Sequence, residues 1–449
     1  MKKRVLIFSA LLFMIFTLPT LASGAVRIEH IGTEYQGYPF NFQDFPEDFS
    51  TGILPWDLDI IDRELVEETG EGVYVAVLDT GLVSNWNWYF PEERIKTEWG
   101  RGFVDKGVLR EDKTGVFVSK VVESADFIGI HPHGTHVTST IIGYSIRGTN
   151  VRGVAPEATI IPVKVLEYYP NLEDDDGIKG VTFGTSEAVA AGIDYVTDLA
   201  IAHSESRFII SMSLGAAGEE ITEVEQAAID RAIANNVIVV ASAGNEGSAG
   251  MGSPGSYGPV ISVGSSGWAW TDYWWCGEWV FFDGTNLWIS GNFWTTDVPE
   301  DNVYLSYISD FSSRERDDLG WDQELDLVAP GSWVVGPYPD QGALPWWSEG
   351  ASRYHDNGAW DYYFVGGTSM ACPHVSGVAA LMLEVNPGLV QHEVEALLMS
   401  SADPLPFSGT KDVVDPNLGV ISVSWGYDGY DAVGAGLLQA DSAVLAAAP

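Results

Sequence analysis

Short, continuously apolar segments alternate with amphipathic helical segments through much of this sequence, and this alternation constrains the fold more than any other feature. The apolar segments are rich in Val and Ile and show no two-residue periodicity. Such segments are typical of strands that are buried on both faces, as in a parallel sheet. We therefore expect sheet strands at residues 73–78, 159–165, 208–212, 237–241 and 260–263.

Helical segments lie between and after these strands. Residues 186–202 and 221–235 show helical spacing, and Ser or Thr near each start can cap the first turn. Residues 369–385 are apolar almost all round and end before Pro387, which predicts a helix through the core. We expect Pro373 to be tolerated because it lies in the first turn of that helix. The alternation predicts one doubly wound α/β domain, since the sequence shows no internal repeat and no linker.

The chain is strongly acidic. Its 449 residues include 63 Asp and Glu against 22 Lys and Arg, which gives a formal net charge of −41. Nucleic acids and anionic membranes would repel such a chain, so we exclude both as partners. A hydrophobic content of 46%, with 17 Trp, indicates a folded core rather than disorder.

Cysteine is scarce in this sequence. Cys276 and Cys372 allow one disulfide at most, so the fold is not built on disulfides. Cys372 lies in the apolar segment 369–385, which favours a free buried thiol over a bond to Cys276.

Residues 1–25 have the pattern of an export signal. Lys2, Lys3 and Arg4 precede an apolar run at 5–18, and small residues suited to a peptidase follow. A retained membrane anchor is the alternative, but this run is shorter than the ~20 residues that usually span a bilayer. We expect the leader to be removed and the mature chain to be secreted and extracellular, without membrane attachment.

Four polar residues follow predicted strands or begin predicted helices. Asp79 ends the first strand, His133 begins a helical run, Asn245 follows a later strand, and Ser369 begins the apolar helix. Alone, each has an ordinary explanation as a turn, loop or capping residue. Together, a carboxylate, an imidazole, an amide and a hydroxyl point to nucleophilic catalysis.

The segments around these residues resemble the catalytic signatures of the subtilisin-like serine proteases, or subtilases. They read DTG at 79–81, HGTHV at 133–137, AGNEG at 243–247 and GTSMACPHVSG at 367–377. The order Asp, His, Ser along the chain is also the subtilisin order. The resemblance extends from about Pro55 to Ala440. It implies a three-layer α/β sandwich, with a mostly parallel central sheet and helices on both faces.

The resemblance also implies the activity, a serine endopeptidase that cleaves proteins or peptides through an acyl-enzyme. Ser369 would be the nucleophile and His133 its general base, while Asp79 would orient the imidazole. The side-chain amide of Asn245 and the backbone N–H of Ser369 would stabilise the oxyanion. No cofactor is required for this chemistry, and the resemblance favours a monomer.

Substrate contacts are implied in the same way. Ser213, Leu214 and Gly215 resemble the segment that pairs with an extended substrate and forms one wall of the specificity pocket. Gly244 would lie on the opposite wall.

Other interpretations of these residues stay open. His131, His133 and His136 could form a metal cluster, although they lack the HExxH spacing. Against that reading, we expect His136 to be a packed structural histidine, and we expect the same of His374. The long loops would also allow an exopeptidase or a narrow processing protease. A calcium-dependent binding protein without catalysis is the alternative from another class.

The sequence departs from the family in two segments. Residues 26–54 are too short for a folded inhibitory prosegment, so we expect the catalytic domain, 55–449, to fold without one. Residues 267–306 form a Trp-rich insertion, which is either an aromatic wall of the cleft or, as we favour, a small core of its own. The tryptophans are Trp268, Trp270, Trp274, Trp275, Trp279, Trp288 and Trp294.

Acidic segments add a question of metal binding. Residues 173–176, which by resemblance approach the non-primed side of the cleft, would favour basic substrate residues, bind calcium or simply be solvated. The family's calcium loop is not recognisable at 144–152, so structural calcium stays unassigned. We expect the acidic segments 57–71, 173–176 and 317–326 to lie at the surface, as an adaptation to salt, calcium or low pH.

Overall fold

A computed structural model describes most of the chain after residue 51. The predicted leader and Cys276 lie outside the described residues. These residues are 38–40, 52–109, 116–146, 149–173, 179–216, 218–269, 280–282, 287–289, 305–339, 352–355, 361–415 and 419–449.

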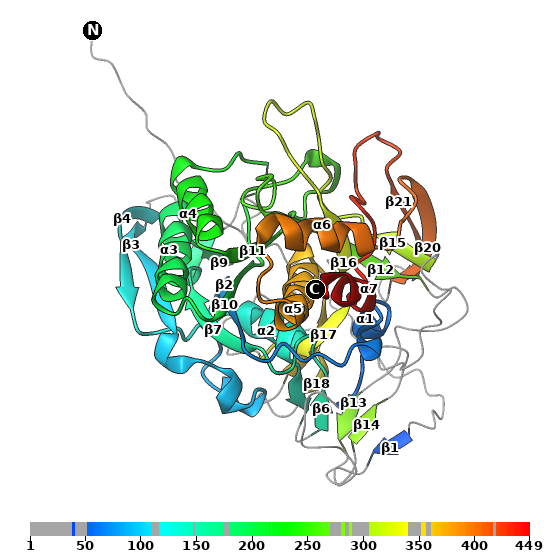
Figure 1. Cartoon of the computed structure of the whole chain (residues 1–449), viewed down its shortest axis with the longest axis horizontal. Coiled ribbons are helices and arrows are strands. Elements are labelled where there is room, and N and C mark those ends of the chain that lie inside the picture. Colours follow the sequence, from blue (N-terminus) through cyan, green and yellow to red (C-terminus); the bar gives the residue numbers. More distant parts are fainter. Residues whose placement is uncertain are drawn as a thin grey trace.

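A nine-stranded sheet forms the centre of the described structure (Figure 1). The neighbouring pairs from β7 to β12 are all parallel, and the sheet has the order β15-β12-β11-β10-β2-β7-β3-β4, with β16 paired to β12. The five expected strands are all present. They are β2 (Val73–Asp79), β7 (Thr159–Lys164), β10 (Arg207–Met212), β11 (Val237–Ser242) and β12 (Ile261–Trp268).

The other strands extend this sheet or form small ones. β3 (Arg101–Leu109) pairs in parallel with β7 and antiparallel with β4 (Val116–Ser124), while β15 (Ser306–Ile308) and β16 (Leu327–Pro330) flank β12. The small sheets are β1 (Tyr38–Phe40) with β13 (Val280–Phe282) and β14 (Leu287–Ile289); β17 (Val334–Pro337) with β18 (Ser352–His355) and β19 (Asp361–Val365); β5 (Tyr144–Ile146) with β6 (Thr149–Val151); β8 (Glu167–Glu173) with β9 (Lys179–Phe183); and β20 (Gly409–Asp415) with β21 (Gly419–Trp425).

Helices cover both faces of the central sheet (Figure 1). Val75 and Val77 of β2 face a core shared with α2 (His133–Ile142) and α5 (Thr368–Val385), while Ala76 and Leu78 face a second core under α3 and α4. This confirms the expected three-layer α/β fold. The remaining helices are α1 (Trp56–Asp59), α3 (Ser186–Ala202), α4 (Glu223–Ala234), α6 (Gln391–Ser401) and α7 (Ala440–Ala447), with 3₁₀ turns at Arg63–Leu65, Trp86–Trp88, Glu92–Arg94, Thr97–Trp99 and Gly247–Ala249.

Side-chain caps fix the starts of the two amphipathic helices. Thr185 accepts a hydrogen bond from the Ala188 N–H before α3. Thr222 and Glu225 form a reciprocal capping box before α4. Each cap satisfies backbone donors that the first turn leaves without partners, so the Ser and Thr signals in the sequence located these helices correctly.

The position of Pro373 corrects one expectation. Helix α5 begins at Thr368, so Pro373 lies in the second turn and not in the first. Proline has no N–H, which leaves the carbonyl of Ser369, four residues earlier, without its helical donor. A side chain supplies that donor instead, because the Ser213 hydroxyl donates to the Ser369 carbonyl at 2.7 Å.

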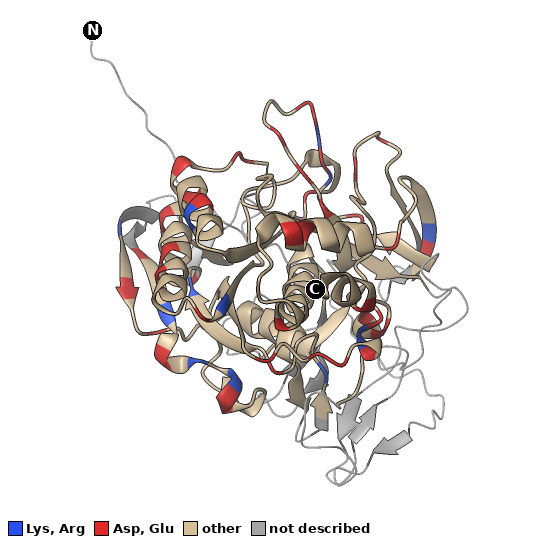
Figure 2. Ribbon diagram, viewed as in Figure 1, with Lys and Arg blue, Asp and Glu red and all other residues tan. Residues whose placement is uncertain are grey.

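Some acidic residues that we expected at the surface are buried. Figure 2 shows many of them on α3, α4, α6 and the connecting loops. However, Asp57 and Asp59 of the segment 57–71, and Asp326 of 317–326, are buried. The expectation that these segments lie wholly at the surface is therefore wrong, because packing of distant elements encloses these three carboxyl groups. Of the helices in the described residues, none is both long and apolar enough to cross a membrane.

Candidate active site

Asp79 and His133 form a buried pair between the end of β2 and the start of α2. The His133 Nδ1 lies 2.9 Å from each carboxylate oxygen of Asp79, and both side chains are almost fully buried. The Thr80 N–H also donates to Asp79 Oδ1 at 2.6 Å. A carboxylate only accepts, so this contact places the proton on Nδ1 and leaves the Nε2 lone pair to accept another proton.

The Asp-Thr-Gly turn explains how this pair is positioned. The Thr80 hydroxyl donates to the His131 carbonyl and accepts from the Gly134 N–H, both at 2.9 Å, which ties β2 to the start of α2. Gly81 has a φ of +78°, and a Cβ there would lie 2.1 Å from the Phe127 carbonyl oxygen. Only glycine fits that backbone without strain.

Ser369 lies in the first turn of α5, beside the end of β10. Its hydroxyl donates to the Ser213 carbonyl at 3.3 Å, while the Ser213 hydroxyl donates to the Ser369 carbonyl. Ser369 is therefore held against the predicted substrate-binding segment. In this structure its hydroxyl is not hydrogen-bonded to His133, and catalytic hydrogen bonds are commonly loose before substrate binds.

Asn245 contacts Thr368, the residue that precedes Ser369. Its Oδ1 accepts from the Thr368 N–H at 2.9 Å and lies 3.0 Å from the Thr368 hydroxyl. Because a backbone N–H can only donate, this contact identifies the amide oxygen. The NH₂ group of Asn245 is consequently the end of the amide that can donate to a bound group.

Gly244 and Glu246 form a compact turn around Asn245. Gly244 has a φ of +107°, and a Cβ there would lie 2.5 Å from Glu246 Oε2. This carboxylate accepts from the Asn245 N–H at 2.8 Å and from the Ser313 hydroxyl at 3.0 Å. Burial raises the pKa of Glu246. We did not predict a role for Glu246, although it belongs to the AGNEG segment.

The segment of Ser213, Leu214 and Gly215 continues directly from β10. Leu214 is buried, and the Ser242 hydroxyl contacts its carbonyl at 3.4 Å. The next residue, Ala216, forms an antiparallel bridge with Ser253. The segment is thus anchored on both sides of Gly215, next to Ser369.

The neighbouring histidines do not converge on a common point. His131 Nδ1 accepts from the His133 N–H at 3.3 Å, and burial, with a smaller contribution from His133, lowers the pKa of His131 to about 3. His136 is fully buried, with Nε2 3.2 Å from the Val334 carbonyl. It is a packed histidine, as expected. Among the described residues, these three do not form a cluster that could hold a metal ion.

Two residues of α5 that we expected to be packing groups are also buried. Cys372 is a free thiol, and burial raises its pKa to about 11. His374 is a buried structural histidine, as expected, and both of its ring nitrogens contact oxygen atoms, including one of Asp57. It is a hydrogen-bonded group and not a passive filler of the core.

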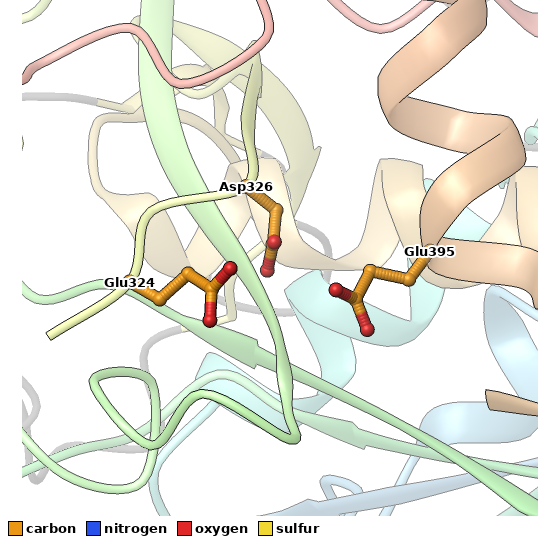
Figure 3. A group of neighbouring side chains, drawn as sticks. All are labelled: Glu324, Asp326 and Glu395. Carbon is orange, nitrogen blue, oxygen red and sulfur yellow. The ribbon is translucent and has the colours of Figure 1, made fainter. Parts of the chain in front are cut away.

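Three carboxylates form the one candidate cation site among the described residues, and Figure 3 shows them facing one another. One ligand oxygen from each of Glu324, Asp326 and Glu395 lies within 4.8 Å of the others. Asp326 Oδ2 accepts from the Ser262 N–H at 2.7 Å, whereas the buried Oδ1 has no hydrogen-bond partner. Burial, assisted by Glu395 and Glu324, raises the pKa of Asp326 to about 8.

No local pattern predicts this cluster, because Glu395 comes from α6 and meets the other two residues only through folding. The acidic loop and the Trp-rich insertion lie mostly outside the described residues. Residues 174–176 of the acidic loop lie outside the described residues. Trp268 stacks on Trp56 at 6.4 Å between ring centroids, but most of the insertion after Ala269 is also outside them.

Known proteins resemble this chain over most of its length. The model of the subtilase family matches residues 70–427. Subtilisin DY of Bacillus licheniformis is 26% identical over 359 residues, which cover 78% of this chain and 92% of that protein. The intracellular serine protease of Paenibacillus polymyxa is 28% identical over 364 residues, covering 78% and 81% respectively.

A solved structure shows the same fold. It is described as proteases from Pseudoalteromonas arctica PAMC 21717, and it aligns with 86% of this chain and 94% of its own at a TM-score of 0.54. The sequence identity is 21%, so this likeness supports the fold and not a particular substrate.

Proposed function

Because the chain belongs to the subtilase family of serine endopeptidases, we propose that it hydrolyses peptide bonds through Ser369, His133 and Asp79. The observation that carries this proposal is the His133 Nδ1 at 2.9 Å from both Asp79 oxygens. This contact fixes the tautomer that a general base requires, with Nε2 able to accept a proton. The substrates are proteins or peptides.

The reaction begins when the Ser369 hydroxyl turns from the Ser213 carbonyl to His133 Nε2. As the Ser369 oxygen bonds to the scissile carbonyl carbon, its proton passes to Nε2 and the carbonyl π electrons move to oxygen. The imidazolium then protonates the leaving amine, the C–N bond breaks and an acyl-enzyme remains. Water, deprotonated by the same nitrogen, hydrolyses that ester and restores Ser369.

We propose that the Asn245 amide and the Ser369 N–H stabilise the oxyanion. Replacing Asn245 with Leu is expected to lower kcat by roughly 10²–10³-fold with little change in KM, a magnitude that comes from subtilisin itself. The measurement is steady-state hydrolysis of a chromogenic peptide.

The control for Asn245→Leu addresses its structural contact with Thr368. Thr368→Val keeps the shape and the backbone N–H donor but removes the hydroxyl contact with Asn245. Its kcat is expected to stay within about tenfold of the parent, since it removes no oxyanion donor. If the kcat of Asn245→Leu were as high as that of Thr368→Val, the proposal that Asn245 stabilises the oxyanion would be wrong.

We propose that the enzyme is exported, that residues 1–25 are removed and that it acts as a monomer. The leader pattern carries this proposal, because the similar protein from Paenibacillus polymyxa is described as intracellular and the relatives therefore do not decide the location. Expression with the native leader should release protein whose N-terminus lies beyond residue 25. Accumulation of the uncut chain inside the cell would contradict export, and a dimer mass in light scattering would contradict the monomer.

We propose that a hard divalent cation, with calcium as the example, binds Glu324, Asp326 and Glu395. These oxygens suit such an ion, and Asp326 brings to the cluster a buried acceptor, Oδ1, that has no hydrogen-bond partner. When bound, the ion would offset two of the three negative charges that the ionised cluster carries. Its effect is on stability, because none of these residues contacts Ser369, His133 or Asp79 in the described structure.

Calcium is therefore expected to raise the Tm of the Ser369→Ala protein, which cannot digest itself. A ligand at about 100 times its Kd adds about 2.7 kcal/mol to the free energy of unfolding, so the rise should be several degrees. Glu395→Gln should reduce this rise, whereas Glu220→Gln, at an exposed site, should not. An equal rise in both variants would contradict the site.

A further inference from the structure

His374 and Asp57 form a second buried histidine and aspartate pair, apart from the one at the catalytic site. His374 follows Ser369 in the same helix, while Asp57 belongs to α1 near the start of the described chain. His374 Nε2 lies 3.1 Å from Asp57 Oδ2, and both residues are almost fully buried. The pair joins the N-terminal segment to the helix that carries the nucleophile.

The contacts of the two ring nitrogens fix the number of protons. His374 Nδ1 lies 2.8 Å from the Met370 carbonyl, which can only accept, so Nδ1 carries a proton. A second proton must then lie between Nε2 and Asp57, on either atom, because an imidazole lone pair facing a carboxylate would leave two acceptors in contact. The pair therefore holds one proton more than a neutral histidine and an ionised aspartate.

The surroundings of Asp57 make this proton necessary. An ionised carboxylate is strongly unfavourable in the protein interior unless it is paired, and Asp57 Oδ1 has no hydrogen-bond partner. The charge of Asp57 also acts on Tyr144 of β5. The Tyr144 hydroxyl, however, donates its hydrogen bond to the Val335 carbonyl at 3.2 Å. Among the groups of the described structure that face Asp57, His374 is the one that can neutralise it.

The same pair bears on the position of Ser369. Pro373 removes the helical donor to the Ser369 carbonyl, and the Ser213 hydroxyl replaces it. His374 Nδ1 then donates to the carbonyl of Met370, the residue after the nucleophile. Side chains thus contact two successive carbonyls in the first turn of α5, and the first of these is the carbonyl that Pro373 leaves without a helical donor.

We propose that Asp57 and His374 share a buried proton and that this protonated pair positions the first turn of α5, and with it Ser369. Asp57 orients the ring, and the ring holds the Met370 carbonyl. Neither residue touches substrate, so both are positioning residues. The inference rests on the proposed role of Ser369, but the shared proton exists independently of catalysis.

Kinetics of two variants test the positioning role. Asp57→Ala removes the partner of Nε2, and kcat is expected to fall at least tenfold with KM unchanged, since small displacements of a nucleophile are costly. Asp57→Asn supplies an amide N–H that can donate to Nε2 of a neutral ring, so kcat should stay within about threefold of the parent. Equal losses in the two variants, or an unchanged kcat in Asp57→Ala, would overturn the positioning role.

Proton NMR tests the shared proton without relying on activity. In the Ser369→Ala protein, a bridging proton between Nε2 and Asp57 should resonate far downfield of the amide region. Adding His133→Ala removes the corresponding resonance of the catalytic pair, and the resonance of the Asp57 and His374 pair should persist in that double variant. Adding Asp57→Asn to the Ser369→Ala protein should abolish the resonance of the Asp57 and His374 pair. Absence of a downfield resonance in Ser369→Ala/His133→Ala would overturn the shared proton even if Asp57→Ala fails to fold. Failure of the proposed function itself would appear differently, as peptidase activity retained by Ser369→Ala.

Discussion

Replacing Ser369 with Ala is expected to lower kcat by about 10⁶-fold, which is the loss found in subtilisin itself. The substitution removes the oxygen that attacks the peptide carbonyl, while His133, Asp79 and Asn245 keep their contacts with one another and with the backbone. The remaining activity would come from oxyanion stabilisation and binding alone. The measurement is single-turnover hydrolysis of a fluorogenic peptide at high enzyme concentration.

A serine on the neighbouring helix provides the control for this prediction. Ser400 lies on the exposed side of α6, and Ser400→Ala should leave kcat and KM unchanged. The Tm of Ser369→Ala should stay close to that of the parent, because the deleted hydroxyl makes one long hydrogen bond. Substantial peptidase activity in Ser369→Ala would refute the assignment of the nucleophile.

Replacing Asp79 with Asn is expected to lower kcat by about 10⁴-fold, as in serine proteases with the same triad. An asparagine amide can donate to His133 Nδ1, which would move the ring proton to Nε2. That nitrogen could then no longer accept the proton of Ser369. Peptide hydrolysis measured between neutral and alkaline pH should show the loss throughout, because the tautomer and not a titration is responsible.

Asp105 of β3 provides a matched control, as another buried aspartate of the same sheet. It accepts from the N–H and the hydroxyl of Thr185, the cap of α3, at 2.8 Å each. Asp105→Asn should therefore lower the free energy of unfolding and leave kcat within a few-fold. If Asp79→Asn behaved like Asp105→Asn, Asp79 would be a structural residue.

Five strands of the central sheet and the helices α3, α4 and α5 could be predicted from local sequence. Residues 73–78 are apolar at every position, and β2 packs its alternate side chains into two cores, as that pattern requires. Thr185 and Thr222 mark the starts of α3 and α4, because their side chains accept hydrogen bonds from backbone N–H groups in the first turn. The Asp79 and His133 contact was expected from family motifs and is present in the structure, whereas its role in catalysis stays a prediction.

The errors share a physical cause, because each depends on residues distant in the chain. Asp57 and Asp326 lie in acidic, surface-like segments, yet His374 and the Ser262 N–H meet them in the interior. Pro373 lies in the second turn of α5, and Ser213, just after β10, donates to the carbonyl that proline leaves without a helical donor. No local pattern contains such partners, so burial and compensation appear only in the folded chain.

Covalent labelling with an organophosphorus fluoride tests the central claim most directly. Peptide mapping of the inactivated enzyme should find one adduct, on Ser369, in proportion to the activity lost. His133→Ala should react far more slowly, because the hydroxyl then lacks its general base. Full activity after exposure to the reagent, or an adduct on a residue other than Ser369, would contradict the account.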